Sequence, residues 1–148
     1  MKKVLIYGAS SSIARFTAIE FAKNGANLIL AGRNFEKLNA VRHDILARYK
    51  TDIEILTSDA LDFENHKAFV DKSINMFGSI DVVLLAHGTL PDQALIQDSP
   101  AQIIEEFNSN ALSVISLATL FASYFEKKKS GTIAVISSVA GDRGRASN

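Results

Sequence analysis

The sequence contains no cysteine, which excludes disulfide bonds, thiolate catalysis and zinc sites with sulfur ligands. It also lacks any apolar run of the length that a membrane span requires. The opening apolar run, Val4-Leu5-Ile6-Tyr7, is too short for the core of a signal peptide. A cytoplasmic protein without a membrane span is therefore expected.

An excess of charge of either sign is lacking as well, because 16 Lys and Arg residues balance 16 Asp and Glu residues. Proteins that follow nucleic-acid phosphates usually carry a basic excess, so nucleic acid is not an expected partner. Apolar residues make up 47% of the 148 residues, as in ordinary globular domains. This length is sufficient for one domain with a substantial core.

Short apolar runs alternate with longer segments in which apolar residues recur at helical spacing. Strands that are apolar throughout and separated by helices form parallel sheets covered on both faces. The pattern predicts a single α/β domain over residues 1–148, with a doubly wound, Rossmann-like parallel sheet. The predicted strands are 4–7, 28–31, 53–56, 80–86 and 132–137, and the predicted helices are 12–24, 35–49, 63–77 and about 100–128.

The last of these helices has a clear start signal and a regular apolar face. Ser99 can cap the helix, Pro100 fits its first position and Gln102 can complete a capping box. The helical spacing predicts that one face of this helix packs on the core, through Ile103, Phe107, Val114, Ala118 and Phe121.

A turn led by glycine, Gly8-Ala9-Ser10-Ser11-Ser12-Ile13-Ala14, joins the first predicted strand to the first predicted helix. A helix N-terminus offers free N–H groups and a positive dipole end, which suit a diphosphate. Gly8 permits a tight turn, Ala14 permits close packing of helix on strand, and the serines add hydroxyl donors. A plain strand–helix connection is the alternative, but the position of the turn favours dinucleotide binding.

The end of the second predicted strand reads Ala31-Gly32-Arg33-Asn34 and contains no acid. Sheets that bind NAD usually place an acid there, which binds the ribose 2′-hydroxyl. Arg33 could instead pair with a 2′-phosphate. A cation is unfavourable at a helix start, which also indicates a bound anion, although a solvated Arg33 remains the alternative. NADP(H) is therefore favoured over NAD(H).

These features resemble the short-chain dehydrogenase/reductase family over all 148 residues. The segment from Tyr7 to Ala14 is similar to the family turn Thr-Gly-x-x-x-Gly-x-Gly, with Ser12 and Ala14 in place of its second and third glycines. The resemblance implies that the cofactor contacts the turn residues Gly8, Ser10, Ser11, Ser12 and Ile13.

Two further segments resemble cofactor-binding parts of the family. Ser58-Asp59-Ala60 is similar to the segment that binds the adenine ring, which indicates Asp59 and Ala60. Leu85-Ala86-His87-Gly88 lies where the family has Asn-Asn-Ala-Gly, although only Gly88 matches. The resemblance implies that Ala86, His87 and Gly88 bind the cofactor, with His87 near the nicotinamide ribose. An Asp59 that only caps its loop, and a His87 that only forms the pocket wall, remain the alternatives.

The same resemblance indicates two catalytic residues. Asn110 matches the helix asparagine that orders a water in the proton relay, and a buried polar side chain within a helix needs such partners. Ser138, within the segment from Gly131 to Gly141, matches the serine that polarises the substrate carbonyl for hydride attack. The implied activity is hydride transfer to or from a small-molecule carbonyl or secondary alcohol, by an enzyme that forms homo-oligomers. The ending Asp142-Arg143 and Ser147-Asn148 is also similar to bacterial reductases of 2-keto sugars on lipid-linked pentoses.

The family reaction also needs a Tyr as general acid and a Lys four residues later that lowers the pKa of the Tyr. Neither follows Ser138 in this sequence. Tyr124 and Lys128 have the Tyr-x-x-x-Lys spacing, but they precede Ser138 and lie at the C-terminal end of the long helix, away from the strand carboxyl ends. Lys127 to Lys129 are expected to form a solvated helix end. The sequence is therefore expected to be truncated after the fifth strand, to expose that strand as an apolar edge, and to be inactive by itself.

A non-catalytic dinucleotide-binding sensor or scaffold is an alternative function. A sugar-nucleotide epimerase is disfavoured, because three residues separate Gly8 from Ser12, and this is the spacing of the short-chain dehydrogenases. The loop from Thr89 to Asp98 is expected to form one wall of the substrate pocket, but its composition does not identify a substrate.

Overall fold

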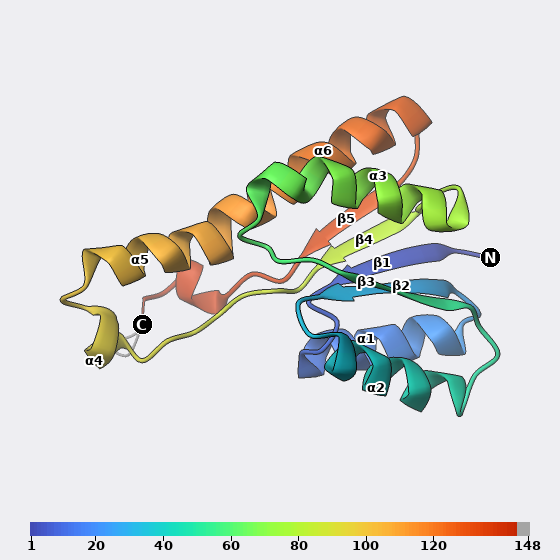
Figure 1. Cartoon of the computed structure of the whole chain (residues 1–148), viewed down its shortest axis with the longest axis horizontal. Coiled ribbons are helices and arrows are strands. Elements are labelled where there is room, and N and C mark those ends of the chain that lie inside the picture. The colour runs from blue at the N-terminus through green and yellow to red at the C-terminus, as the bar shows by residue number, and fades with distance from the viewer. Residues whose placement is uncertain (145–148) are drawn as a thin grey trace.

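The computed structural model describes residues 1–144, apart from the side chain of Leu95. The Ser147-Asn148 part of the C-terminal resemblance lies outside these residues. A parallel sheet of five strands in the order β3-β2-β1-β4-β5 forms the centre of the molecule (Figure 1). The strands are β1 (Lys3–Tyr7), β2 (Asn27–Gly32), β3 (Ile53–Thr57), β4 (Val82–Leu85) and β5 (Thr132–Val135).

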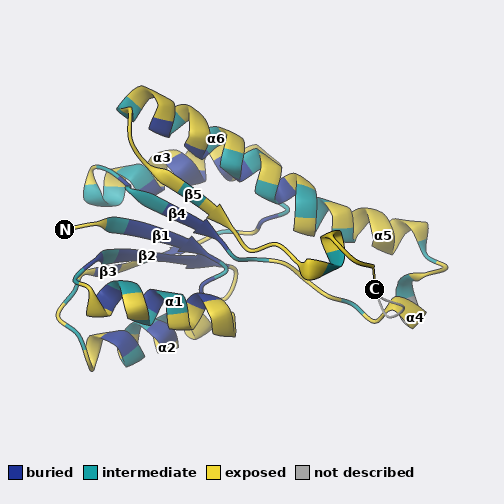
Figure 2. Cartoon of the chain, turned by 180° about the vertical axis from the view of Figure 1, so that it is seen from behind, coloured by how far each residue is buried: buried dark blue, intermediate teal, exposed yellow. Residues whose placement is uncertain are grey.

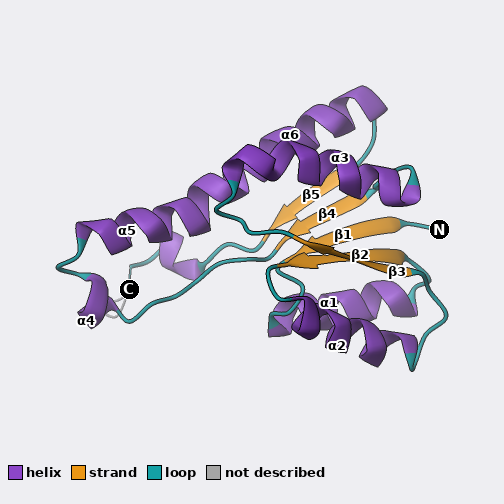
Figure 3. Ribbon diagram, viewed as in Figure 1, coloured by secondary structure: helices purple, strands orange, loops and turns teal. Residues whose placement is uncertain are grey.

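Helices cover both faces of the sheet, as the sequence predicts (Figure 3). The helices α1 (Ser12–Lys23) and α2 (Phe35–Leu46) lie on one face, and α3 (His66–Phe77) and α6 (Ser113–Lys128) lie on the other. Successive strand residues point to opposite faces. Val4 and Ile6 accordingly belong to the core under α1 and α2, whereas Leu5 and Tyr7 belong to the core under α3 and α6. The doubly wound, Rossmann-like fold is confirmed.

The strand order reverses at β1, which pairs with β2 on one side and with β4 on the other. Tyr7, the last residue of β1, is level with Ala31 of β2 and Leu85 of β4. The carboxyl ends of three strands therefore meet at one edge of the sheet. Open α/β sheets bind ligands in the crevice at such a reversal.

The predicted long helix consists of three segments in the structure, α5 (Pro100–Phe107), a π-helical turn η2 (Asn108–Leu112) and α6. Ser99 caps α5 as predicted, since its Oγ accepts a hydrogen bond from Gln102 N at 3.5 Å. The predicted core face is wrong at Ile103 and Phe107, which are 39% and 65% exposed. Both lie on α5, which projects beyond the sheet, so no strand lies beneath them (Figure 2). Phe121, on α6, is fully buried as predicted.

Two short elements were not predicted from the sequence, α4 (Gln93–Ile96) and the 3-10 turn η3 (Val139–Gly141). The helix predicted over 63–77 begins with a 3-10 turn, η1 (Phe63–Asn65), and continues as α3. The strand β5 forms one edge of the sheet, where Val135 is 46% exposed, and Ile136, directly after it, 43% exposed. Within residues 1–144, no helix has the length and apolarity that a membrane span requires.

The C-terminal end of α6 lies against the start of β4. Lys128 Nζ donates to Ile80 O and to Asp81 Oδ1, both at 2.6 Å, and this ion pair holds the pKa of the Asp81 carboxyl below its ordinary value. Tyr124 OH accepts a hydrogen bond from Ile80 N at 3.1 Å. The prediction of a fully solvated lysine run is therefore wrong at Lys128. The rejection of Tyr124 and Lys128 as a catalytic pair is consistent with this placement, because both lie at the edge opposite the strand carboxyl ends.

Candidate functional site

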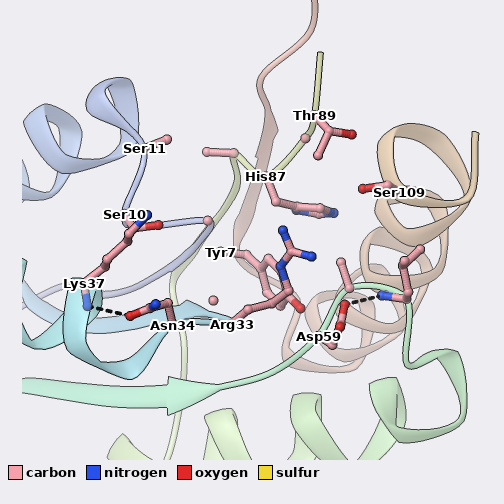
Figure 4. A pocket seen from close by; sticks show the side chains of 16 residues that line it. Tyr7, Ser10, Ser11, Arg33, Asn34, Lys37, Asp59, His87, Thr89 and Ser109 are labelled. Atoms are coloured by element: carbon pink, nitrogen blue, oxygen red, sulfur yellow. Dashed lines mark hydrogen bonds between the residues drawn. The ribbon is translucent and has the colours of Figure 1, made fainter. Parts of the chain in front are cut away.

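A cleft of about 220 Å³ opens at the carboxyl ends of β1, β2 and β4 (Figure 4). It brings together nine of the predicted cofactor-binding residues: Gly8, Ser10, Ser11, Arg33, Asp59, Ala60, Ala86, His87 and Gly88. It also includes Thr89, from the loop expected to form a pocket wall, and six residues that were not among the predicted site residues: Tyr7, Gly32, Asn34, Lys37, Leu61 and Ser109. Ser12, Ile13, Asn110 and Ser138 are not part of this lining.

The turn after β1 crosses directly over the end of β4. Gly8 has a φ of +81°, and a Cβ on it would lie 2.6 Å from His87 N and 2.8 Å from the carbonyl carbon of Ala86. Only glycine adopts this conformation readily, and only glycine fits this close approach. The first predicted requirement of a dinucleotide turn, a glycine that leaves the strand in a tight bend, is therefore present.

The first turn of α1 follows at once. Ser11 Oγ accepts a hydrogen bond from Ala14 N at 3.4 Å and caps the helix, while Ala14 is fully buried against the sheet. The small side chain at Ala14 thus permits the close packing that the sequence predicted. Ser12 and Ile13 lie on the exposed side of this turn, so their contact with a cofactor remains a prediction.

Two cations stand where β2 leads into α2. Arg33 and Lys37 are both exposed, and neither forms an ion pair with any described residue. Between them, Asn34 caps α2 through its Oδ1, which accepts a hydrogen bond from Lys37 N at 2.9 Å. In Figure 4 the Lys37 side chain extends toward Ser10, whereas Arg33 extends toward Tyr7 and His87.

The loop after β3 closes the cleft on the other side. Asp59 Oδ1 accepts a hydrogen bond from Leu61 N at 3.0 Å, so Asp59 both caps its loop and lines the cleft. Ala60 O lies 3.1 Å from His66 Nε2, which must donate because a carbonyl oxygen only accepts. Ser116, on α6, then donates to His66 Nδ1 at 2.8 Å. Burial lowers the pKa of His66, which favours this neutral form.

His87 lies two residues after the end of β4 and forms part of the floor of the cleft. Its Nε2 lies 2.8 Å from Ser113 Oγ, and that hydroxyl donates its proton to Ser109 O at 2.6 Å. His87 Nε2 must therefore be the donor to Ser113, which fixes the tautomer of the neutral ring. Burial lowers the pKa of His87 to about 4. These contacts favour His87 as a neutral wall residue over a general acid or base at neutral pH.

Tyr7 completes this floor. Its ring lies 4.7 Å from the His87 ring at an angle of 62°, and its OH donates to Ser58 Oγ at 3.1 Å. Burial raises the pKa of Tyr7 to about 12, so the phenol stays protonated. Tyr7 was not among the predicted site residues, although its place in the turn motif, where the family has Thr, was a usable signal.

The two predicted catalytic residues lie outside the cleft lining. Ser138 follows β5 and is exposed, and its Oγ caps η3 by accepting a hydrogen bond from Ala140 N at 3.1 Å. Asn110 is exposed rather than buried, so that part of the prediction is wrong. Its amide is nevertheless satisfied, because Oδ1 accepts from Thr89 N at 2.7 Å and Nδ2 donates to Thr89 O and to Glu106 Oε2.

Asn110 also lies in the π-helical turn, and such turns occur often at functional sites. Its Oδ1 would be 3.0 Å from a Cβ built on Gly88, which places Asn110 at the rim of the cleft. In the part of the chain that the structure describes, no group of three His, Asp or Glu residues could hold a metal ion.

Comparison with known proteins decides the family. A model of the short chain dehydrogenases matches residues 2–148. The chain belongs to the short-chain dehydrogenase family. An uncharacterized oxidoreductase of Listeria monocytogenes, Lmo0432, is 35% identical over 143 residues, which cover 95% of this chain and 56% of that protein.

Solved short-chain dehydrogenase structures share the fold. ElxO with NADP bound superposes with a TM-score of 0.87 at 26% identity, over 99% of this chain and 59% of its own. A 7α-hydroxysteroid dehydrogenase complexed with NADH superposes with a TM-score of 0.88 at 24% identity, over 99% of this chain and 56% of its own. This short-chain dehydrogenase sequence thus spans about half the length of the relatives it matches.

Proposed function

We propose that this protein is an NADP(H)-dependent oxidoreductase that acts on a carbonyl or a secondary alcohol of a small molecule. The observation that carries the proposal is the cleft at the ends of β1, β2 and β4, with Arg33 at the position where NAD-binding sheets have an acid. Family membership supports oxidoreductase chemistry. When bound, the nicotinamide dinucleotide would supply or accept the hydride.

The residues of the cleft fit such a dinucleotide. Gly8 lets the turn pass against the end of β4, where a Cβ would overlap the His87 backbone, and this brings the N-terminus of α1 to the cleft. Ser10 and Ser11, with the N-terminus of α1, would bind the diphosphate, and Asp59 with Ala60 would bind the adenine. Ala86, His87 and Gly88 would lie along the nicotinamide ribose, with Ser12 and Ile13 contributing from the first turn of α1.

The proposed catalytic residues lie at the same edge of the sheet. Ile136 N donates to Leu85 O at 3.0 Å, so Ser138 follows the end of β5 beside the end of β4. The Ser138 hydroxyl would donate a hydrogen bond to the substrate carbonyl oxygen, and Asn110 would act in the proton relay. A Tyr, with its pKa lowered by a neighbouring Lys, would protonate the resulting alkoxide; neither follows Ser138 among the 148 residues.

Arg33→Asp tests the cofactor preference. The change replaces a potential partner of the 2′-phosphate with a repelling carboxylate, so the Kd for NADPH should rise about 100-fold while that for NADH changes little. Isothermal titration calorimetry with both cofactors measures this difference. Lys50→Asp provides the matched control, since it makes the same charge change beside a separate hollow, outside the cleft lining.

Equal effects of Arg33→Asp on NADPH and NADH would overturn the proposed preference for NADP(H). Cofactor binding without hydride transfer in the full-length protein would instead support the alternative, a non-catalytic dinucleotide-binding sensor or scaffold.

A further inference from the structure

His66, the first residue of α3, is a buried titratable group that the proposed hydride transfer does not use. We propose that His66 is a positioning residue for the cofactor, which holds the loop after β3 in the conformation that binds the adenine. This inference rests on the proposed function, because Asp59 and Ala60 of that loop line the proposed cofactor cleft. It goes beyond that function, because His66 itself does not line the cleft.

The loop after β3 is shaped mainly by its own local hydrogen bonds. Leu61 N donates to Asp59 Oδ1 at 3.0 Å, and Asp62 N donates to Asp59 O at 3.2 Å. Such bonds fix the shape of a turn but not its position against the rest of the protein. The bond from His66 Nε2 to Ala60 O supplies that position, and no other hydrogen bond reaches Ala60 O among the described residues.

The other ring nitrogen of His66 reaches a second helix. Ser116 Oγ, on α6, lies 2.8 Å from His66 Nδ1, so the ring spans from the loop to α6. The helices α3 and α6 lie side by side over one face of the sheet (Figure 1). Leu117, next to Ser116, is fully buried in the core of that face. The far end of this connection is therefore a packed element.

The burial of His66 makes the connection rigid. The side chain is 1% exposed, and the neutral ring donates from Nε2 and accepts at Nδ1, so both of its polar atoms are satisfied. A ring with both nitrogens engaged in a packed core has one orientation, which fixes the place of Ala60 O. A loop that is ordered before binding pays less conformational entropy when its ligand arrives, so the affinity for adenine should be higher.

His66→Gln and His66→Asn divide the two hydrogen bonds of the ring between them. The glutamine amide reaches the position of Nε2 and can donate to Ala60 O, whereas the asparagine amide reaches only the position of Nδ1, beside Ser116. Isothermal titration calorimetry of the full-length protein with NADPH and NADH tests the inference. The Kd for both cofactors should rise about tenfold in His66→Asn and less than about twofold in His66→Gln.

Val70→Ala is the matched control for lost stability. Val70 is 3% exposed, lies about one turn after His66 on the same helix and does not line the cleft. Val70→Ala should lower the melting temperature as the His66 variants do, because it opens a cavity in the core, and should leave both Kd values unchanged. Reduced nicotinamide mononucleotide, which has no adenosine, should bind every variant as it binds the native protein.

Ser116→Ala is a second test, in a helix that alanine does not disturb. It removes the bond between His66 and α6 while the ring can still donate to Ala60 O. The Kd for NADPH and NADH should rise about threefold. This variant should fold even where His66→Asn does not, and an unchanged Kd for both cofactors would count against the positioning role.

The outcomes separate the inference from the function on which it rests. Unchanged affinity of His66→Asn, or equal weakening by His66→Gln and His66→Asn, would overturn the positioning role while NADPH and NADH still bind the native protein. Binding of neither cofactor by the native protein would overturn the proposed function, and the inference with it. The preference for NADP(H) is tested separately, because His66→Asn acts on the adenine that both cofactors share, whereas Arg33→Asp changes the ratio of their affinities.

Discussion

Two regions of this chain carry similar apolar sequences but bury them to different extents. The packed region, formed by the sheet with α1, α2, α3 and α6, has two continuous cores. The projecting region, formed by α4, α5 and η3, lies beyond the sheet (Figures 1 and 2). Phe121 in the packed region is fully buried, whereas Phe107 in the projecting region is 65% exposed.

The difference shows what a helical pattern predicts and what it does not. Apolar residues at helical spacing predict which side chains share a face, but not whether another element lies against that face. The apolar face of α6 packs against the sheet. Among the described residues, no strand packs against the apolar face of α5 in the same way.

The largest expected effect concerns the point where two backbones of the packed region touch. Gly8→Ala should lower the free energy of unfolding by more than about 4 kcal/mol, because its Cβ would overlap the His87 backbone at a positive φ. Gly25→Ala is the matched control, with a φ of +75° and nothing within 4 Å of the new Cβ. It should cost only about 1–2 kcal/mol.

Urea denaturation of both variants measures the two losses of unfolding free energy. Because both glycines have a positive φ, the difference between the losses reports the overlap with the His87 backbone. Similar losses for Gly8→Ala and Gly25→Ala would mean that the turn and the end of β4 can move apart. Such movement would remove the rigid turn on which the proposed diphosphate site depends.

The second prediction compares the same substitution in the two regions. Phe121→Ala should lower the free energy of unfolding by about 3–4 kcal/mol, because it opens a cavity in a closed core. Phe107→Ala should change it by less than about 0.5 kcal/mol. Chemical denaturation measures both, and a large loss for Phe107→Ala would show that the projecting region is covered in solution.

Much of the packed region could be predicted from the sequence, because its signals are local. Continuous apolar strands, a glycine turn at a strand end and a capping serine can each be recognised from a few neighbouring residues. The turn motif at Gly8 and the end of the second strand at Arg33 are local signals of the same kind, so this part of the cleft could be predicted. Lys37 was not predicted to line the cleft, because its place there depends on how α2 leaves β2.

The remaining features depend on contacts between distant segments. The π-helical turn shifts the backbone bonding, with Ser113 N donating to Asn108 O, and no side-chain pattern signals this shift. The tautomer of His87 depends on Ser113, which lies on another element. The burial of α5 depends on how far the sheet extends, and sequence periodicity carries no information about that.

The smallest expected effect concerns His87, at the boundary between the two regions. Its pKa is lowered to about 4 from an ordinary value of 6.5. Between these values the unfolded chain binds a proton that the folded chain does not, so stability is complete above the ordinary value and falls as the pH falls toward 4. From about pH 7 to about pH 5 the loss due to His87 should be about 1–2 kcal/mol, allowing for its partial exposure.

His87→Gln removes this proton while the amide can still donate to Ser113. Urea denaturation of the native protein and of His87→Gln at the two pH values isolates the contribution, since the other titrating groups, including His66, are common to both. The variant should lose less stability on acidification than the native protein. Identical losses would show that the end of β4 is as open to solvent as the projecting region, and that His87 is not held neutral by the packed core.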